Sequence, residues 1–240
     1  MLSTVNSLDP LLKRPFSLYR WLGQDFQILY KVVGRLTNIL KDKKPHDTVE
    51  IIGPLGNGFP IIKGKDKPIL IGGGLGSVPL FALAESIIQQ SQIPPRPPLS
   101  KPWLVEGRWE DFKPVFFIGA KTRREVLYID ALKSIRIKPI VSTDDGSLGQ
   151  KGTVLSVFNK FLTSNFSVLS SHLLYACGPK PMLQELSHIT KKHSLTGYIA
   201  LEENMACGIG ACLSCVVNTI DGFKRVCKEG PVFSMEEIIW

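Results

Sequence analysis

Long apolar stretches are missing from this 240-residue sequence, and none reaches the roughly 18 residues that a membrane-spanning helix needs. The first residues also lack a cationic region followed by an apolar run, which is the pattern of a secretory signal. The 29 lysines and arginines outnumber the 21 aspartates and glutamates, yet no basic run is interleaved with aromatic residues. These absences predict a cytoplasmic protein that contacts neither a membrane nor nucleic acid.

Cysteine is scarce as well, because the chain has only five, but four of them lie within one stretch of 21 residues. Their spacing is C-x4-C-x2-C-x11-C, at Cys207, Cys212, Cys215 and Cys227. The opening C-x4-C-x2-C matches the loop that wraps a [2Fe–2S] cluster in plant-type ferredoxins. Gly208 and Gly210 let the backbone turn tightly, so that amide groups can point at the sulfur atoms. We therefore expect these four cysteines to ligate such a cluster.

Two other uses of clustered cysteines fit less well. A structural zinc site usually pairs two C-x2–4-C knuckles, and here the second knuckle is missing. A disulfide framework belongs to oxidising compartments, whereas this sequence predicts a reducing one. The pattern therefore favours an iron–sulfur cluster, which moves single electrons and needs both a donor and an acceptor.

The chain divides into three segments by pattern. Residues 1–60 indicate strands and turns, residues 61–197 alternate strands with helices, and residues 198–240 carry the clustered cysteines. The alternation predicts a parallel sheet with helices on both faces. The predicted strands lie in 26–34, 48–59, 68–74, 115–119, 138–143 and 172–178, and the predicted helices in 78–90, 122–134, 152–164 and 180–193. The proline-rich residues 94–114 predict a surface loop, one that is able to contact a partner.

A glycine-rich turn, ILIGGGLGSVP, follows the first strand of the middle segment at residues 69–79. Backbone amides in such a turn, together with the start of the next helix, can bind a pyrophosphate. The turn departs from the dinucleotide fingerprint G-x-G-x-x-G, because Pro79 stands at the third glycine position. Glycine also serves tight packing between a strand and a helix, so that alternative stays open.

Two shorter motifs are also candidates for binding. YACGPKPM, at residues 175–182, places a turn at the carboxyl end of a strand, where open α/β sheets bind ligands. As an alternative, Cys177 is a small buried apolar residue. KRPFS, at residues 13–17, offers Arg14 and Ser17 to a phosphate or a flavin ring edge, or else forms an ordinary surface turn.

In order, the chain contains RPFS, LYKVVGRLT, GPLGNGF, GGGLGSVP, STDDGSLGQKG, ACGPKPM, ENMACGIGACLSC and VCKEGPVF. From about Asp9 onward this succession resembles the ferredoxin–NADP reductase superfamily and, most closely, the electron-transfer (iron–sulfur) subunits of class 1B dihydroorotate dehydrogenases. The resemblance implies an α/β plus β fold. It consists of a flavin-binding β-barrel in residues 1–60, a parallel-sheet NAD(P)-binding domain in 61–197 and a small [2Fe–2S] domain in 198–240. Only 13 residues precede Arg14, so the barrel is expected to be truncated at its N-terminal side.

The resemblance also assigns cofactor-binding residues by position. Those that match the FAD motifs are Arg14, Pro15, Phe16, Ser17, Leu29, Tyr30, Lys31, Leu36 and Thr37. Those that match the NAD site are Gly72, Gly74, Gly76, Cys177, Gly178 and Pro179. The cluster ligands are again Cys207, Cys212, Cys215 and Cys227. Leu36 stands where the family usually has glycine. No residue is assigned to catalysis, because the cofactors carry the redox chemistry.

By resemblance, the chain is an electron-transfer subunit of a flavin and iron–sulfur oxidoreductase. It is expected to pass electrons between NAD(H), FAD and the [2Fe–2S] cluster, to or from the FMN of a dihydroorotate dehydrogenase catalytic subunit in pyrimidine (UMP) biosynthesis. The expected assembly is a heterotetramer with two of each subunit. One alternative is a related NAD(P)H reductase subunit that serves ferredoxin, sulfide or hydrogenase chemistry, and another is a non-catalytic module that has lost FAD.

The sequence does not decide between NAD and NADP. Arg123 and Arg124 follow a predicted strand. Two arginines at that place suit the 2′-phosphate of NADP, and they equally suit the solvated start of a helix. The resemblance favours NAD.

Overall fold

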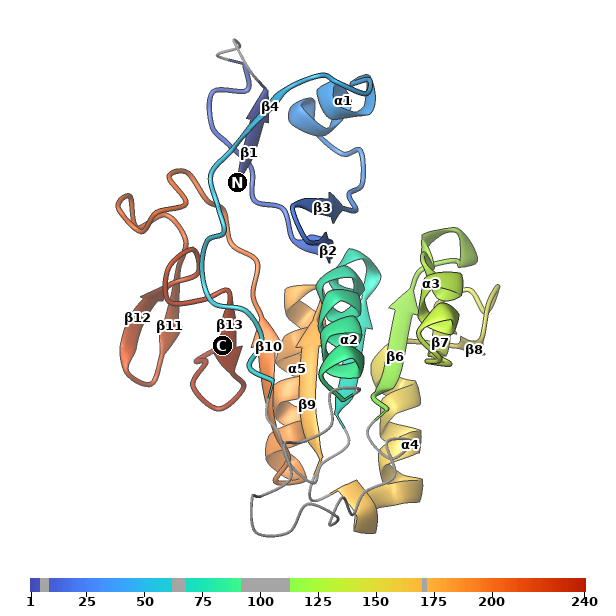
Figure 1. Cartoon of the computed structure of the whole chain (residues 1–240). Helices are drawn as coiled ribbons and strands as arrows, with labels where there is room; N and C mark the ends of the chain where they lie inside the picture. Colours follow the sequence, from blue (N-terminus) through green and yellow to red (C-terminus); the bar gives the residue numbers. More distant parts are fainter. Residues whose placement is uncertain (5–8, 62–67, 92–112, 170–171) are drawn as a thin grey trace, which may run out of the picture.

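The computed structural model describes residues 1–4, 9–61, 68–91, 113–169 and 172–240. A large α/β unit is formed by the middle of the chain (Figure 1). The N-terminal strands lie at one end of this unit, above it in the view of Figure 1, and the C-terminal hairpin lies beside it.

A seven-stranded sheet forms the centre of the α/β unit, with the strand order β13-β10-β9-β5-β6-β7-β8 among the described residues. All neighbouring strands run parallel except β13, which pairs antiparallel with β10 at one edge. The strands are β5 (Ile69–Gly73), β6 (Val115–Ala120), β7 (Ile140–Thr143), β8 (Gln150–Lys151), β9 (Leu173–Cys177), β10 (Thr196–Ala200) and β13 (Val232–Ser234). The predicted parallel sheet is therefore confirmed.

Helices cover both faces of this sheet, because alternate residues of its strands point to opposite sides. Leu70 of β5 and Phe116 of β6 belong to one buried apolar cluster, which they share with α2 and α3. Their neighbours Ile71 and Phe117 belong to a second cluster, with α4 and α5. The helices are α2 (Ser77–Ser91), α3 (Ile129–Ser134), α4 (Val154–Leu169) and α5 (Lys180–Lys192). Burial on both faces explains why these strands are apolar without a polar alternation.

One predicted helix, over residues 122–134, is interrupted. Arg123–Glu125 form a single 3₁₀ turn, Tyr128 has a left-handed backbone with φ 51°, and α3 begins only after it. The rings of Tyr128 and Phe81 lie 5.5 Å apart in the core. This packing stabilises a backbone conformation that non-glycine residues rarely adopt, and a pattern of apolar spacing does not reveal it.

The residues up to 61 contain four short strands and one short helix. Their bounds are β1 (Leu2–Thr4), β2 (Leu18–Leu22), β3 (Asp25–Ile28), β4 (Val49–Ile51) and α1 (Arg35–Lys41). β1 pairs with β4 and β2 pairs with β3, both antiparallel, and the two pairs belong to separate sheets. In the described part of this segment they do not close into a complete barrel. The strand predicted over 26–34 ends at Ile28, and α1, with only seven residues, shows too little periodicity to be predicted.

Aromatic and charged contacts fix this N-terminal segment on the α/β unit. Arg20 on β2 forms an ion pair with Glu85 on α2, with nitrogen and oxygen 2.5 Å apart. The Arg20 guanidinium also lies 5.5 Å from the centre of the Phe81 ring. Tyr19 stacks on the same ring, with the two centroids 4.8 Å apart. β2 is therefore packed across α2, next to the glycine-rich turn.

The C-terminal segment shares the central sheet with the α/β unit. The predicted boundary between residues 197 and 198 falls within β10, and β13 completes the same sheet. β11 (Val216–Thr219) and β12 (Gly222–Arg225) form a hairpin. Cys215 and Cys227 are buried in the apolar cluster that also contains α4 and α5. Two of the clustered cysteines are therefore part of the core of the α/β unit.

The predicted proline-rich loop at residues 94–114 falls almost entirely outside the described residues and stays a prediction. Of the helices that the structure describes, α4 is the longest, with 16 residues and a kink at Asn165. None of the described helices combines the length and the apolar character that crossing a membrane requires.

Candidate functional site

The predicted nicotinamide residues come together at the carboxyl edge of the sheet. Gly72 of β5 lies in register with Cys177 of β9, so the turns that follow these two strands are neighbours. A Cβ atom placed on Gly76 would lie 2.5 Å from the Cα of Gly178 and 2.6 Å from the carbonyl carbon of Cys177. The two turns are therefore packed backbone against backbone, and only glycine fits at position 76.

The backbone at Gly74 is not covered by the packing of these two turns. Its φ is +57°, and, apart from its chain neighbours, no atom of the described residues lies within 4 Å of the place where its Cβ would stand. Met182 covers the neighbouring backbone instead, because its Sδ would lie 2.6 Å from a Cβ on Gly73 and 3.1 Å from one on Gly178. The free backbone at Gly74, just before α2, fits a phosphate group bound by amides at the start of a helix.

Hydrogen bonds from two hydroxyl groups stabilise the glycine-rich turn. Ser77 Oγ donates a hydrogen bond to the carbonyl oxygen of Gly74 at 2.6 Å, and the Tyr128 hydroxyl is hydrogen-bonded to Ser77 Oγ. Because the Ser77 proton is used on Gly74, Tyr128 is the donor in the second bond. Burial raises the pKa of Tyr128, so the phenol keeps its proton at neutral pH. Neither Ser77 nor Tyr128 was predicted as a site residue, and the two lie 51 positions apart in the sequence.

Cys177 has a structural side chain. It is buried at the end of β9, and burial raises the pKa of its thiol to about 12. A thiol that stays protonated is neither a nucleophile nor a metal ligand at neutral pH. The side chain therefore acts as a small apolar residue. Its backbone lines the nucleotide turn together with Gly178, and Pro179 precedes the first residue of α5.

The first two predicted flavin motifs contact one another. The motif that begins at Arg14 leads into β2, and the motif that ends at Lys31 follows β3, so the hairpin between them brings both to one place. The rings of Phe16 and Tyr30 meet edge to face, with centroids 5.9 Å apart. An aromatic pair of this kind can border a flavin ring system.

The charged ends of these motifs point in different directions. The exposed Arg14 guanidinium donates to the carbonyl oxygen of Leu12 at 3.0 Å and suits a phosphate. Lys31 instead forms an ion pair with Glu125 in the α/β unit at 3.1 Å. Among the other residues of these two motifs, Pro15 and Ser17 are exposed and Leu29 is half-buried.

The third predicted flavin motif has a local role. Thr37 Oγ1 accepts hydrogen bonds from the amides of Val33 and Gly34, both at 3.0 Å, and donates to the carbonyl oxygen of Gly34 at 2.9 Å. These three bonds use the one donor and two acceptor positions of a hydroxyl to fix the start of α1. Leu36 is buried, at 3% exposure, so its side chain packs inside the N-terminal segment. Only the backbone of these two residues is left for a cofactor.

The four clustered cysteines meet as two pairs. The backbone amide of Cys212 donates a hydrogen bond to Cys207 Sγ, and the backbone amide of Cys227 donates one to Cys215 Sγ. Nowhere in the described ranges do three or more histidine, cysteine or acidic side chains gather closely enough to hold a single metal ion. A structural zinc site needs its four ligands around one point, whereas a [2Fe–2S] cluster takes two thiolates on each iron. The paired arrangement therefore fits the two-iron cluster.

Backbone amides point at the sulfur atoms within each pair. The amides of Ala211 and Cys212 lie 3.3 and 3.4 Å from Cys207 Sγ, and the amide of Cys227 lies 3.5 Å from Cys215 Sγ. Such hydrogen bonds stabilise thiolate and help to set the potential of a cluster.

Tight turns of the backbone make these amides available. Gly208 and Gly210 have φ angles of +72° and +83°, the left-handed conformation that glycine adopts without strain. Leu213 has φ 58° and is exposed. The predicted role of the two glycines, to fold the backbone around the sulfur atoms, agrees with this geometry.

The thiols of Cys212 and Cys227 differ in acidity. Hydrogen bonds from the hydroxyl and the amide of Ser214 lower the pKa of Cys212 to about 6, so this residue is largely thiolate at neutral pH. Burial raises the pKa of Cys227 to about 11. Iron binds thiolate, so it must displace a proton from the buried site but not from the exposed one.

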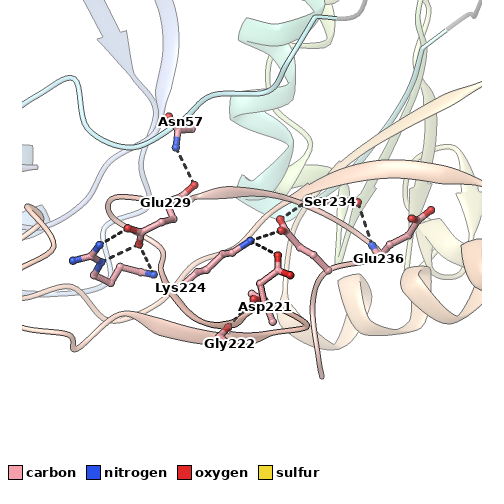
Figure 2. A network of polar contacts seen from close by, with 10 residues as sticks. Asn57, Asp221, Gly222, Lys224, Glu229, Ser234 and Glu236 are labelled. Atoms are coloured by element: carbon pink, nitrogen blue, oxygen red, sulfur yellow. Dashed lines mark hydrogen bonds and ion pairs between the residues drawn. The ribbon is translucent and has the colours of Figure 1, made fainter.

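The N-terminal segment reaches the cysteine loops directly. The side-chain amide of Asn57 donates to the carbonyl oxygens of Lys228 and Glu229, at 3.2 and 2.9 Å, in the turn that follows Cys227 (Figure 2). On the other loop, a Cβ on Gly208 would collide with the sulfur of Met1. The predicted flavin and cluster segments are therefore in contact, which the sequence did not indicate.

Arg123 and Arg124 are exposed just beyond β6, at the carboxyl edge of the sheet. The backbone amide of Arg123 donates to Ser147 Oγ at 2.8 Å. This place is open to a nucleotide, but the contacts do not distinguish NAD from NADP, and the choice of NAD stays a prediction.

Comparison with known proteins agrees with this site. Residues 202–239 match the family model of the iron–sulfur cluster binding domain of dihydroorotate dehydrogenase B. A solved NADH-dependent reduced ferredoxin-NADP oxidoreductase matches with a TM-score of 0.68 and 27% identity, over 90% of this chain and 69% of that one. The ferredoxin reductase of a carbazole 1,9a-dioxygenase shares the fold, with a TM-score of 0.58 and 21% identity over 75% and 51% of the two chains. The fold and the site define an oxidoreductase of the ferredoxin-reductase class.

Two curated relatives are more similar in sequence, and both are electron transfer subunits of dihydroorotate dehydrogenase B (NAD(+)). The protein of Caldanaerobacter subterraneus subsp. tengcongensis is 36% identical over 233 residues, covering 95% of this chain and 81% of the relative. That of Geobacillus kaustophilus is 35% identical over 240 residues, covering 97% and 82%. The chain belongs to the family of dihydroorotate dehydrogenase B electron transfer subunits. The predicted family, fold class and oxidoreductase class are confirmed.

Proposed function

We propose that this chain transfers electrons between NAD(H), FAD and a [2Fe–2S] cluster, and exchanges them with the FMN of a separate dihydroorotate dehydrogenase catalytic subunit in pyrimidine biosynthesis. When bound, the flavin takes two electrons from the nicotinamide and releases them singly to the cluster. The observation that carries the proposal is the pairing of Cys207 with Cys212 and of Cys215 with Cys227, through amide-to-sulfur hydrogen bonds, inside the family-matched segment.

The chain itself supplies binding and placement. The backbone at Gly74 would bind the pyrophosphate of NAD(H), and the exposed Arg14 would bind a phosphate of FAD. The Phe16 and Tyr30 pair would border the flavin. Lys31 and Asn57 tie the flavin segment to the other two segments, so the distances between cofactors are fixed by protein contacts. On this proposal residues 1–60 serve FAD, 61–197 serve NAD(H) and 198–240 serve the cluster.

A catalytic partner follows from the family, because its members are electron transfer subunits. We propose that the partner carries FMN and that two copies of each chain form a heterotetramer. We also propose a cytoplasmic location, where pyridine nucleotides are available and thiols stay reduced.

Co-expression with the catalytic subunit of the same organism tests the proposal. The purified complex should show flavin absorption together with the broad visible bands of a [2Fe–2S] centre, and it should couple NADH oxidation to the reduction of orotate. A colourless protein that contains zinc would contradict the proposal and support a module that has lost FAD.

A second candidate function is that of an NAD(P)H:ferredoxin reductase subunit. The likeness to the solved NADH-dependent ferredoxin-NADP oxidoreductase, with 27% identity and a TM-score of 0.68, favours it. The two functions share their cofactors and differ in the partner. Reduction of ferredoxin by NADPH, without any FMN subunit and without orotate-linked turnover, would select the second.

A further inference from the structure

One arginine joins the two chain segments that carry the clustered cysteines. Arg225 Nη1 donates a hydrogen bond to the carbonyl oxygen of Gly210 at 2.9 Å. Gly210 stands between Cys207 and Cys212, whereas the backbone of Arg225 lies two residues before Cys227. A single side chain therefore spans both ligand-bearing segments.

Glu229 fixes the orientation of this arginine. Arg225 Nε donates to Glu229 Oε2 at 2.9 Å, and a second guanidinium nitrogen pairs with Oε1. The backbone amide of Arg225 also donates to Oε2, at 2.8 Å. Figure 2 shows the Glu229 carboxylate as the centre of these contacts. Two-point pairing of a planar guanidinium with a carboxylate gives a strong and directional contact.

The two charges of this pair are not equivalent toward the cysteines. The guanidinium donates to the carbonyl oxygen of Gly210, in the loop between Cys207 and Cys212, and its Nη1 would lie 3.4 Å from a Cβ on Gly210. The charged partner of Glu229 is Arg225 itself. Both side chains are about 30% exposed, so water screens the pair only in part. Of the two charges, the positive one is therefore the one whose side chain contacts the loop between Cys207 and Cys212.

We propose that Arg225, oriented by Glu229, is a positioning residue that raises the reduction potential of the iron–sulfur cluster. The inference rests on the proposed function, because it takes the four cysteines as cluster ligands. Reduction adds one negative charge to the cluster, and a nearby positive charge stabilises that reduced form. Net charge and hydrogen bonding around the sulfur atoms are the means by which a protein sets such a potential.

A redox titration of the purified holo-protein tests this, followed by the electron paramagnetic resonance signal of the reduced cluster. Arg225→Gln removes the cation and leaves Glu229 unpaired, so the midpoint potential should fall. Glu229→Gln leaves the cation without its counter-charge, so the potential should rise. The double variant, with both Arg225→Gln and Glu229→Gln, carries neither charge. Its midpoint potential should lie between that of Arg225→Gln and that of the wild type.

Lys224 provides a matched control on the same strand. Its side chain pairs with Asp221 at 3.2 Å and with Glu237 at 2.8 Å (Figure 2), and as the neighbour of Arg225 on one strand it points to the opposite face. Lys224→Gln changes the charge of the protein by the same amount as Arg225→Gln, so the potential should stay at the wild-type value. Arg225→Lys keeps the charge but loses the two-point pairing, and it should lower the potential less than Arg225→Gln does.

Several results would overturn the inference. One is a shift of the same sign in Arg225→Gln and Glu229→Gln, and another is an equal shift in Lys224→Gln. If Arg225→Gln fails to assemble a cluster, Glu229→Gln decides alone, and an unchanged or lowered potential contradicts the idea. If the wild-type protein shows a cluster signal but the variants have the wild-type midpoint potential, only this inference is rejected. A wild-type protein without any cluster signal rejects the proposed function and the inference together.

Discussion

Asn57 donates a hydrogen bond from its side-chain amide to the carbonyl oxygen of Glu229 at 2.9 Å, although the two residues lie 172 positions apart in the sequence. Asn57 belongs to the proposed flavin segment, and Glu229 belongs to the turn that contains Cys227. The same amide reaches Lys228, and the backbone amide of Asn57 donates to Gly230. The turn that follows Cys227 is therefore held in place by contacts from the proposed flavin segment.

Replacing Asn57 with alanine should loosen this junction. The change removes two side-chain hydrogen bonds, each worth about 0.5–1.5 kcal/mol, and we expect a loss of about 1 kcal/mol in unfolding free energy because the site is exposed. Urea unfolding followed by cluster absorbance measures it. Asn38→Ala is the control, since Asn38 donates only within α1, to Gly34 at 3.0 Å. An equal loss of unfolding free energy in both variants would contradict the specific role of Asn57.

Replacing Cys212 with serine should abolish the cluster and leave the flavin in place. The expected result is loss of the broad visible bands and of bound iron, with NADH-to-dye activity through FAD retained. Cys177→Ala is the matched control, because Cys177 is buried outside the paired cysteines and should keep full iron content. If dye reduction disappears with the cluster, the two modules are not separable.

Replacing Gly76 with alanine should weaken the binding of NADH. The added Cβ would stand 2.5 Å from Gly178 Cα, so the two turns must move apart, at a cost of about 1–3 kcal/mol. We expect the dissociation constant for NADH to rise about tenfold or more, since about 1.4 kcal/mol corresponds to a factor of ten. Equilibrium titration measures it. Gly58→Ala is the control, because no heavy atom lies within 4 Å of its added Cβ.

The ion pair between Arg20 and Glu85 should contribute measurably to stability. Both side chains are partly buried, at 30% and 14% exposure, and the contact joins β2 to α2. With allowance for solvent screening, we expect Arg20→Met to cost about 1–2 kcal/mol in unfolding free energy. Lys133→Met breaks a more exposed pair with Asp130 and should cost less than about 0.5 kcal/mol. Equal losses would show that burial of the first pair has no effect.

Cys177 should make the protein less stable at high pH. Burial raises the pKa of this thiol to about 12, from 9.0 for a free thiol. Below pH 9 both states are protonated and the stabilisation is complete; between 9 and 12 the unfolded state loses its proton first, so stability falls as pH rises. The variant Cys177→Ala has no thiol at this position, so its stability should not show this fall at high pH. Its stability relative to the wild type should improve by roughly 2 kcal/mol between about pH 8 and about pH 10.5 in urea unfolding. Parallel pH profiles would contradict the prediction.

Features that depend on neighbouring residues could be predicted from the sequence. The glycine-rich turn between β5 and α2 is one, because a short apolar strand, a run of glycines and an apolar helix follow one another without a break. The cysteine spacing is another, since the ligand loop is local in sequence. The observed bounds of β5 and α2 differ from the predicted ones by only a few residues.

Features that depend on distant contacts could not be predicted. Tyr128 leaves the helical conformation because its ring packs on Phe81 and its hydroxyl reaches Ser77. Thr37 matches a flavin motif in sequence, but its hydroxyl is used within α1. The contact between Asn57 and Glu229 joins two loops that carry no shared pattern. In each case the deciding partner lies elsewhere in the chain.

β13 follows Cys227 in the sequence and covers the edge of the sheet at β10. During synthesis, the backbone groups of β10 therefore remain without their edge strand until all four cluster cysteines have left the ribosome. An uncovered strand edge is a site at which chains associate wrongly. The central sheet can therefore be completed only after the last clustered cysteine has been synthesised. A chain that stops before β13 leaves the edge at β10 open to association with other chains.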